Sequence, residues 1–176
     1  MRSALLGLGL CSVLLAASPA WAQFANRSIG FSAGYQKLNE ESGLNWGVPA
    51  GILYTAYLDA GFEATGHFHV MFLQDPVLRK TVVGVTPQIG IRYLFLQEHV
   101  RPYVALDLSY LHLFYDTGGN QAASNSYVGV GPNLGIDFFV SDTWSVGVRG
   151  QYNLYVMLNK PTQSSLGATL EVATYY

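Results

Sequence analysis

The sequence has little charge, a single cysteine and, after its first 22 residues, no long apolar run. Of its 176 residues, 9 are Lys or Arg and 11 are Asp or Glu, so 11% of the chain is charged and the formal net charge is -2. Soluble domains contain about 25% charged residues, so this chain has too few for an ordinary water-facing surface. The charge balance excludes a basic nucleic-acid binder, and the 50% hydrophobic content excludes a disordered chain.

The first 22 residues are typical of a cleavable signal peptide. Arg2 gives a positive start, residues 4–17 are apolar, and Ala20-Trp21-Ala22 matches the small-x-small cleavage pattern. Pro19 and the small residues favour cleavage over a membrane anchor. The cysteine, Cys11, lies in this segment, so no disulfide is expected in the mature chain. We predict a signal peptide at residues 1–22 and one domain at residues 23–176.

The mature chain lacks the roughly 20 consecutive apolar residues of a transmembrane helix. Apolar and polar residues alternate instead, with the period of two that is typical of β-strands. In 27–38, for example, Ile29, Phe31, Ala33 and Tyr35 alternate with glycine, serine and glutamine. Eight segments have this pattern and predict an all-β chain: 27–38, 46–58, 61–72, 82–94, 103–114, 128–139, 144–155 and 166–176.

The charged residues inside these segments all fall on the polar face. That face is otherwise rich in Gly, Ser, Thr and Asn, whereas the water-facing side of a soluble sheet would be rich in Lys and Glu. Small polar residues inside and apolar residues outside are what a closed sheet in lipid requires. The pattern predicts an eight-stranded antiparallel up-and-down transmembrane β-barrel. Its lumen-facing charged residues are Glu63, Arg92, Asp107, Asp137, Arg149 and Glu171.

The aromatic residues and the lengths of the connections predict how the barrel is oriented in the membrane. Aromatic side chains near strand ends are expected to form the two interfacial girdles of the barrel. Alternate connections are short and long, which is typical of periplasmic turns and extracellular loops. The expected girdle residues are Trp46, Tyr93, Tyr110, Tyr127 and Trp144. Two prolines on the lipid face, Pro87 and Pro132, predict local β-bulges because proline cannot donate to a ladder.

With these features the sequence resembles the family of small eight-stranded bacterial outer-membrane barrels, the OmpA, OmpX and OmpW-like group. The resemblance rests on the signal peptide, the strand opening Arg-Pro-Tyr-Val-Ala-Leu at 101–106, the stretch Gly-Val-Gly-Pro-Asn-Leu-Gly-Ile-Asp at 129–137, and the terminal aromatic strand. It implies a porin-like protein of the Gram-negative cell envelope, embedded in outer-membrane lipid. It also implies that Tyr176 is an assembly signal read by the barrel-assembly machinery.

The six lumen charges allow two interpretations. They could line a gated proton or ion path, or they could form an ion-pair network that neutralises itself. We favour the network, because an unpaired charge in so narrow a lumen costs several kcal/mol. His67 and His69 share one strand face at a spacing that could bind a metal, but no third ligand is near in sequence. Packing near Glu63 is the favoured interpretation, so no metal site and no cofactor is expected.

Some barrels of this architecture are lipid A acyltransferases and deacylases, so we searched for a nucleophile. The deacylases resemble one another in a His-x-Ser pairing on a late strand, and that pattern is absent here: no histidine follows His112. Ser109 and His112 lie on opposite faces of their segment and cannot act as a nucleophile and its base. The sequence therefore predicts a protein that is not an enzyme.

Two non-catalytic roles remain. The favoured one is a structural or scaffold component, a subunit of a larger envelope complex such as motility, adhesion or secretion machinery, with other envelope proteins as partners. The alternative is an OmpW-like narrow channel or binder for small hydrophobic molecules. Its candidate apolar pocket is formed by Leu53, Met71, Leu111, Leu113 and Tyr155, all expected toward the extracellular half.

Overall fold

A computed structural model describes residues 26–39, 46–75, 80–96, 98–115, 123–157 and 160–176. The predicted signal peptide and the tips of the predicted extracellular loops lie outside these residues. In the described part of the chain, no helix is long and apolar enough to cross a membrane.

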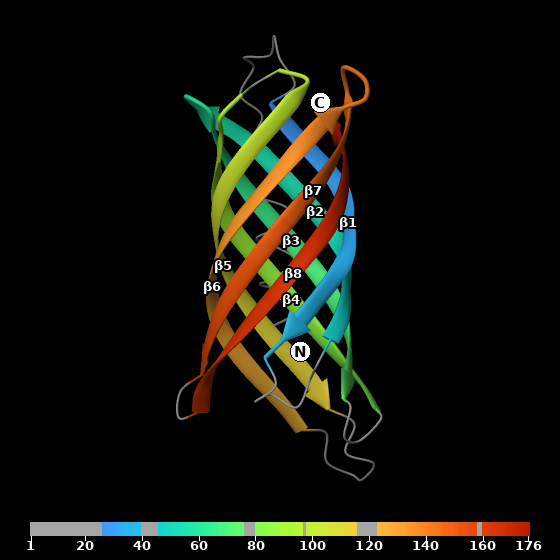
Figure 1. The fold of residues 1–176 in the computed structure, drawn as a ribbon, viewed down its shortest axis with the longest axis vertical. Coiled ribbons are helices and arrows are strands. Elements are labelled where there is room, and N and C mark those ends of the chain that lie inside the picture. Colours follow the sequence, from blue (N-terminus) through green and yellow to red (C-terminus); the bar gives the residue numbers. More distant parts are fainter. Residues whose placement is uncertain (1–25, 40–45, 76–79, 97, 116–122, 158–159) are drawn as a thin grey trace, which may run out of the picture.

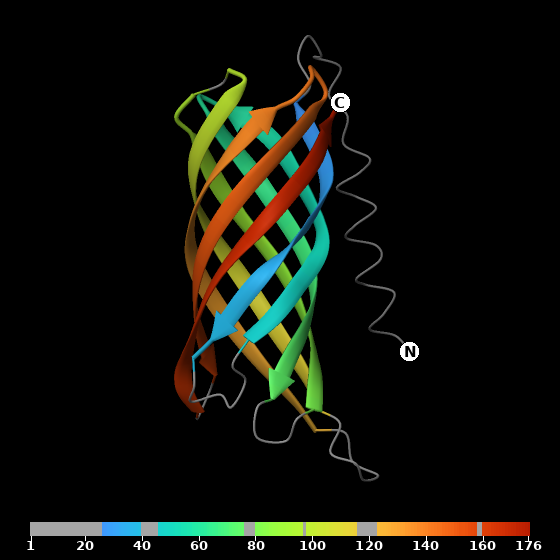
Figure 2. The same cartoon turned by 45° about the vertical axis from the view of Figure 1, so that its right-hand side comes forward.

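The described residues form eight strands in one closed sheet. Each strand pairs antiparallel with the next, and β1 closes the barrel against β8. Figures 1 and 2 show a tall, narrow barrel with steeply tilted strands. This confirms the predicted fold class. The strands are β1 (Arg27–Leu38), β2 (Trp46–Asp59), β3 (Phe62–Asp75), β4 (Lys80–Leu94), β5 (Val100–Tyr115), β6 (Ala123–Phe139), β7 (Trp144–Met157) and β8 (Lys160–Tyr175).

The barrel has two distinct ends. At the turn end, short connections join β2 to β3, β4 to β5 and β6 to β7, and β1 begins where β8 finishes (Figure 1). The tightest connection is Ala60-Gly61, with positive φ angles of 49° and 86°, which suits the right-handed twist of the two strands that it joins. At the opposite, loop end lie the other four connections.

Side chains alternate between the outside and the lumen as the pattern predicts. In β1, Phe31 is 72% exposed whereas the adjacent Ser32 is 4% exposed. The other strands have the same burial pattern, which is the reverse of that in a soluble protein: large apolar side chains are exposed and polar ones are buried. Such a surface is compatible with lipid and not with water, because it presents a continuous apolar face.

Four strands begin earlier than predicted, and the difference is largest, five and six residues, in β6 and β8. β6 starts at Ala123 instead of residue 128, and β8 starts at Lys160 instead of residue 166. The additional residues are mostly Ser, Asn, Thr and Gln, so they have no apolar alternation to reveal them. The backbone ladder between neighbouring strands continues past the apolar band, and hydrogen bonding alone extends these strands.

The bulges predicted at Pro87 and Pro132 are wrong. Each proline pairs in continuous register with one neighbouring strand. On the other side the ladder skips the proline and the residue before it, then resumes in the same register. The missing N–H is thus accommodated by a short gap in pairing. The register shifts that the structure does show lie at Tyr57/Asp59 and Tyr155/Met157.

Four of the five expected girdle residues are exposed on the outside. Trp46, Tyr93, Tyr110 and Trp144 have exposures between 37% and 50%. Tyr127 is a correction, because it is 3% exposed and packs in the lumen. Its position near the start of β6 resembles a girdle position, but in the observed register it has the inward parity of Gly129 and Gly131.

A lumen-facing glycine permits close contact between two strands. A Cβ at Gly51 would collide with the carbonyl oxygen of Phe68 and lie 2.8 Å from the His69 Cα, both on the paired strand β3. By contrast, a Cβ at the lipid-facing Gly66 would meet no atom within 4 Å. Backbone atoms cannot move aside as a flexible side chain can, so Gly51 is required where Gly66 is not.

We therefore expect Gly51→Ala to lower the free energy of unfolding by about 1–3 kcal/mol, the usual cost of overpacking. The matched variant Gly66→Ala is expected to change it by less than about 1 kcal/mol. Urea unfolding in lipid vesicles, followed by tryptophan fluorescence, measures both. Equal stability of the two variants would contradict the observed register of β2 and β3.

Candidate functional site

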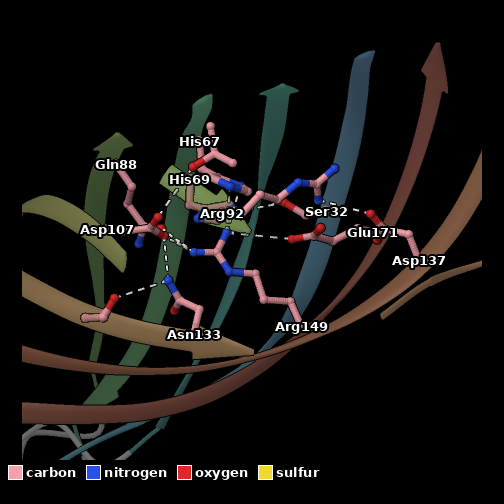
Figure 3. Close-up of polar contacts among 12 residues, drawn as sticks. Ser32, His67, His69, Gln88, Arg92, Asp107, Asn133, Asp137, Arg149 and Glu171 are labelled. Atoms are coloured by element: carbon pink, nitrogen blue, oxygen red, sulfur yellow. Dashed lines mark hydrogen bonds and ion pairs between the residues drawn. The ribbon is translucent and has the colours of Figure 1, made fainter. Parts of the chain in front are cut away.

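The lumen holds the charged residues of the membrane-spanning strands. The six side chains that the sequence analysis placed there are each at most 5% exposed. They come from six different strands, and Figure 3 shows five of them, Arg92, Asp107, Asp137, Arg149 and Glu171, close together in the lumen. They form two groups, one around Arg92 and one around Arg149.

Arg92 on β4 contacts side chains of four other strands, β3, β5, β6 and β8. Its Nε donates to Glu63, the residue directly opposite on β3, and its Nη1 donates across the lumen to Asp137 on β6 at 3.0 Å. Its Nη2 donates to the Tyr175 hydroxyl at 3.4 Å, and the guanidinium carbon lies 4.8 Å from the centre of the Tyr103 ring. The guanidinium is thus surrounded by acceptors and an aromatic face, which favours a buried cation.

Arg149 on β7 is the centre of the second group. Its Nη2 donates to Asp107 on β5, across the lumen, and to Gln88 at 3.4 Å. Its Nη1 lies 2.6 Å from the His67 Nε2 and 3.8 Å from the Glu171 Oε1. These contacts cross the barrel rather than following one hairpin, so Arg149 ties opposite walls of the lumen together (Figure 3).

Polar neighbours complete the group around Asp107. The Asn133 Nδ2 donates to the Asp107 Oδ2 at 2.8 Å, and the Thr65 hydroxyl donates to its Oδ1 at 3.4 Å. Glu171 is less well satisfied, since its Oε1 has no hydrogen-bond partner among the described residues. The two groups contain two guanidiniums and four carboxylates. The arrangement therefore holds charge in place, with an excess of carboxylate at Glu171.

Little empty space remains around the network. Two cavities of about 10 Å³ each adjoin it, and both are lined in part by Arg92 and Glu171. A buried water needs about 10–15 Å³, so each cavity is at the lower limit for one water molecule. The centre of the lumen is packed rather than open.

The two histidines on β3 lie side by side, with ring centres 5.7 Å apart. His67 contacts Arg149, and the His69 Nε2 lies 2.7 Å from the Ser32 hydroxyl. The expected packing near Glu63 is therefore replaced by contacts with Arg149 and Ser32. Within the part of the chain that the structure describes, no three His, Cys, Asp or Glu side chains could together hold a metal ion.

Apolar side chains fill the lumen toward the loop end. Four of the five candidate pocket residues, Met71, Leu111, Leu113 and Tyr155, are at most 1% exposed and belong to one cluster. Leu53 is a correction: it packs with Ala173, Tyr175 and Phe139 in a separate cluster on the turn-end side. Leu53 lies in the middle of its strand. The alternation of residues predicts that its side chain faces the lumen, but not which end of the barrel it lies closer to. The first cluster, the loop-end plug, also contains Leu38, Leu73, Val82 and Tyr127.

The sequence analysis missed a pair of residues on the outside of the barrel. Ser109 is buried in the lumen while His112 faces outward, so these two residues are separated as predicted. However, the His112 Nδ1 lies 2.7 Å from the hydroxyl of Ser126, the residue directly opposite on β6. The search was confined to single strands, and β6 was expected to begin after Ser126. Only the cross-strand register reveals this contact.

The network predicts a large effect of removing one arginine. Arg149→Met should lower the free energy of unfolding by about 3–5 kcal/mol, because it leaves buried Asp107 without its counter-charge. Adding Asp107→Asn should restore part of the loss, and a double-mutant cycle measures the coupling between them. The measurement is urea unfolding in vesicles, with heat-dependent mobility on a gel as a check. Additive effects of the two substitutions would contradict the ion-pair assignment.

Solved structures with similar folds are outer-membrane barrels. Neisserial surface protein A, from Neisseria, superposes with a TM-score of 0.73 and is 15% identical, covering 85% of this chain and 97% of its own. The N-terminal barrel domain of OprF from Pseudomonas aeruginosa gives 0.60 at 14% identity, covering 85% and 97%. OprG from the same organism gives 0.51 at 12% identity, covering 86% and 96%. At these identities the likeness shows the fold alone.

The sequence comparison assigns the family. No curated protein matches the chain significantly. A family model described as the outer membrane protein beta-barrel domain matches residues 3–172, nearly the whole chain. Together with the closed eight-stranded barrel and its apolar exterior, this match places the protein in the bacterial outer membrane. The chain belongs to the outer membrane protein beta-barrel domain family.

Proposed function

We propose that this protein is a structural component of the outer membrane whose lumen is non-catalytic, and that it acts as a scaffold subunit of a larger envelope complex. The filled lumen is the observation that carries the proposal. The charged network occupies the middle, and the loop-end plug closes one side with side chains that are at most 3% exposed. The charged side chains of the lumen form ion pairs with one another, so they serve the stability of the barrel.

The same observation disfavours an OmpW-like channel or a binder of small hydrophobic molecules. An apolar ligand needs a cavity of a few hundred Å³ that it can enter. Here Met71, Leu111, Leu113 and Tyr155 fill the space that such a ligand would need. With the lumen closed, the surfaces left for interaction are the outer wall and the two ends. A barrel of this kind acts through what it contacts, which is why a partner role is proposed.

The last strand is the basis for proposing a partner that binds the protein during biogenesis. Tyr176 is 58% exposed at the turn end, and its N–H donates to the carbonyl of Arg27 on the closing strand at 2.9 Å. An exposed terminal aromatic residue at the β1–β8 seam is accessible before the barrel closes. We propose that the barrel-assembly machinery binds it there, and that the mature partners are outer-membrane lipid and other envelope proteins.

Planar-bilayer recording tests the closed lumen. The purified barrel should give no steady single-channel current, because neither water nor ions have a continuous path through the plug and the network. Replacing two plug residues, Leu111→Ala with Tyr155→Ala, is the comparison that should introduce leak currents if the plug is the barrier. Steady currents from the unmodified protein would contradict a closed lumen and favour the channel alternative.

The scaffold role predicts a stable complex in native membranes. After mild detergent extraction, the barrel should migrate on a native gel well above the mass of one chain, and cross-linking should identify the same envelope protein in repeated preparations. Purified barrel reconstituted alone provides the reference mass. Migration of the native protein as a single chain would contradict the subunit proposal while leaving the fold unaffected.

A further inference from the structure

Three polar side chains form a connected group on the outer wall, on β5 and β6 near the loop end. We name Tyr110, His112 and Ser126 the outer serine group. The Tyr110 hydroxyl donates to the Ser126 Oγ at 2.9 Å, and the Ser126 Oγ lies 2.7 Å from the His112 Nδ1. None of these residues belongs to the lumen network, and the proposed scaffold role does not use them.

The directions of the hydrogen bonds give each group a role. Ser126 accepts the hydrogen bond of the Tyr110 hydroxyl and keeps its own hydroxyl proton, which it can donate to the His112 Nδ1 in the tautomer that has its proton on Nε2. A serine hydroxyl within hydrogen-bond reach of an imidazole base is the usual arrangement of an activated nucleophile.

Aromatic neighbours fix the orientation of the base. The Tyr110 ring stacks on the His112 ring with centres 6.2 Å apart and planes 15° apart. The Phe114 ring meets the other side edge-on at 4.4 Å and 73°. Residues two positions apart on one strand share a face, so all three rings point outward in a row. The imidazole is therefore held with Nδ1 toward Ser126.

The surroundings of the outer serine group are apolar and continue past it toward the loop end. Phe72, Val83 and Phe114 lie opposite one another on neighbouring strands, and their exposures are 49%, 37% and 49%. This apolar row lies two residues closer to the loop end than His112. Tyr110 is one of the exposed girdle residues, so the outer serine group lies at the head-group level of the membrane, where the ester groups of lipids are found.

The lumen contains a similar contact that cannot act on a substrate. The Ser32 hydroxyl lies 2.7 Å from the His69 Nε2, but Ser32 is 4% exposed and His69 is 2% exposed. What distinguishes Ser126 is access from the membrane. Ser126 and His112 are both partly exposed on the lipid-facing wall.

We propose that Ser126 is a nucleophile toward acyl esters of membrane lipids, with His112 as its general base. The Ser126 Oγ forms a bond to the ester carbonyl carbon as its proton passes to the His112 Nδ1, and the carbonyl oxygen becomes the oxyanion of a tetrahedral intermediate. Collapse breaks the ester C–O bond, and the leaving alcohol takes the proton from His112. Water, deprotonated by His112, then releases the fatty acid and regenerates Ser126.

This reaction concerns the outer wall and leaves the proposed role of the lumen unchanged. It extends the function to lipid-ester hydrolysis, a possibility that a search along single strands did not find. If it fails, the scaffold proposal still stands. The two proposals therefore fail independently.

Covalent labelling tests the nucleophile directly. The folded full-length barrel in lipid nanodiscs is treated with a fluorophosphonate probe carrying an alkyl chain, and the labelled peptide is located by mass spectrometry. The expected result is one modified residue, Ser126. Ser126→Ala should abolish labelling, and His112→Gln should slow it by about 100-fold or more, the usual contribution of a general base.

Two matched serine variants serve as controls. Ser124→Ala removes an exposed serine two positions away on the same strand, and Ser32→Ala removes the buried serine beside His69. Both should label like the unmodified protein. Heat-dependent gel mobility confirms that every variant is folded.

Hydrolysis of a long-chain p-nitrophenyl ester supplies a second readout, which should be lost in Ser126→Ala and retained in Ser32→Ala. Labelling of the unmodified protein no faster than Ser126→Ala, or at a different serine, would overturn the proposal. Labelling of Ser126 that does not depend on His112 would overturn the assignment of the base.

Discussion

Charge inside the barrel wall must be neutralised within a lumen that eight strands leave about as wide as the side chains that fill it. Lipid outside cannot solvate a carboxylate, and open sheet edges cannot exist in hydrocarbon. The strands therefore turn their charged residues inward, and Arg92 and Arg149 bring together carboxylates from opposite walls. The contacts Arg92–Asp137 and Arg149–Asp107 join strands that are not paired with each other, so the shape of the barrel and the position of its charges depend on each other.

The ends of the lumen follow from the same constraint. Between the network and the loop end, the inward positions include the Leu, Met, Val and Tyr residues of the loop-end plug, together with buried polar residues such as Gln36 and Gln163. Below the network, a smaller cluster around Leu53 and Tyr175 lies toward the turn end, where the Arg101 guanidinium carbon is 4.1 Å from the centre of the Phe139 ring. The polar centre is thus enclosed between apolar layers. A closed, ordered interior is consistent with a protein that functions through contacts made by its outer surface.

The fold was predictable from the sequence because residues along a strand of a membrane barrel alternate between apolar, lipid-facing positions and mostly polar, lumen-facing positions. We call this alternation parity. Parity placed Glu63 and Arg92 on the inner face, and the register then set them opposite each other. Parity gives no information on how far along the barrel axis a side chain lies, or on which residue it contacts. Leu53 was therefore expected at the wrong end, and Tyr127 was expected in the girdle because it lies near a strand end, although its parity is inward. Parity also could not show that His67 lies against Arg149 rather than near Glu63. The contact of His112 with Ser126 depends on pairing between two strands, which no single-strand pattern contains.

The accessibility of the lumen to water-soluble reagents tests the account most directly. Thr65→Cys places a thiol beside Asp107 in the middle of the barrel, and Ser141→Cys places one in an exposed turn, in a mature chain expected to contain no other cysteine. The account predicts that a charged thiol reagent modifies position 141 within minutes and position 65 only after unfolding in urea. Rapid modification of position 65 in the folded barrel would contradict a closed lumen.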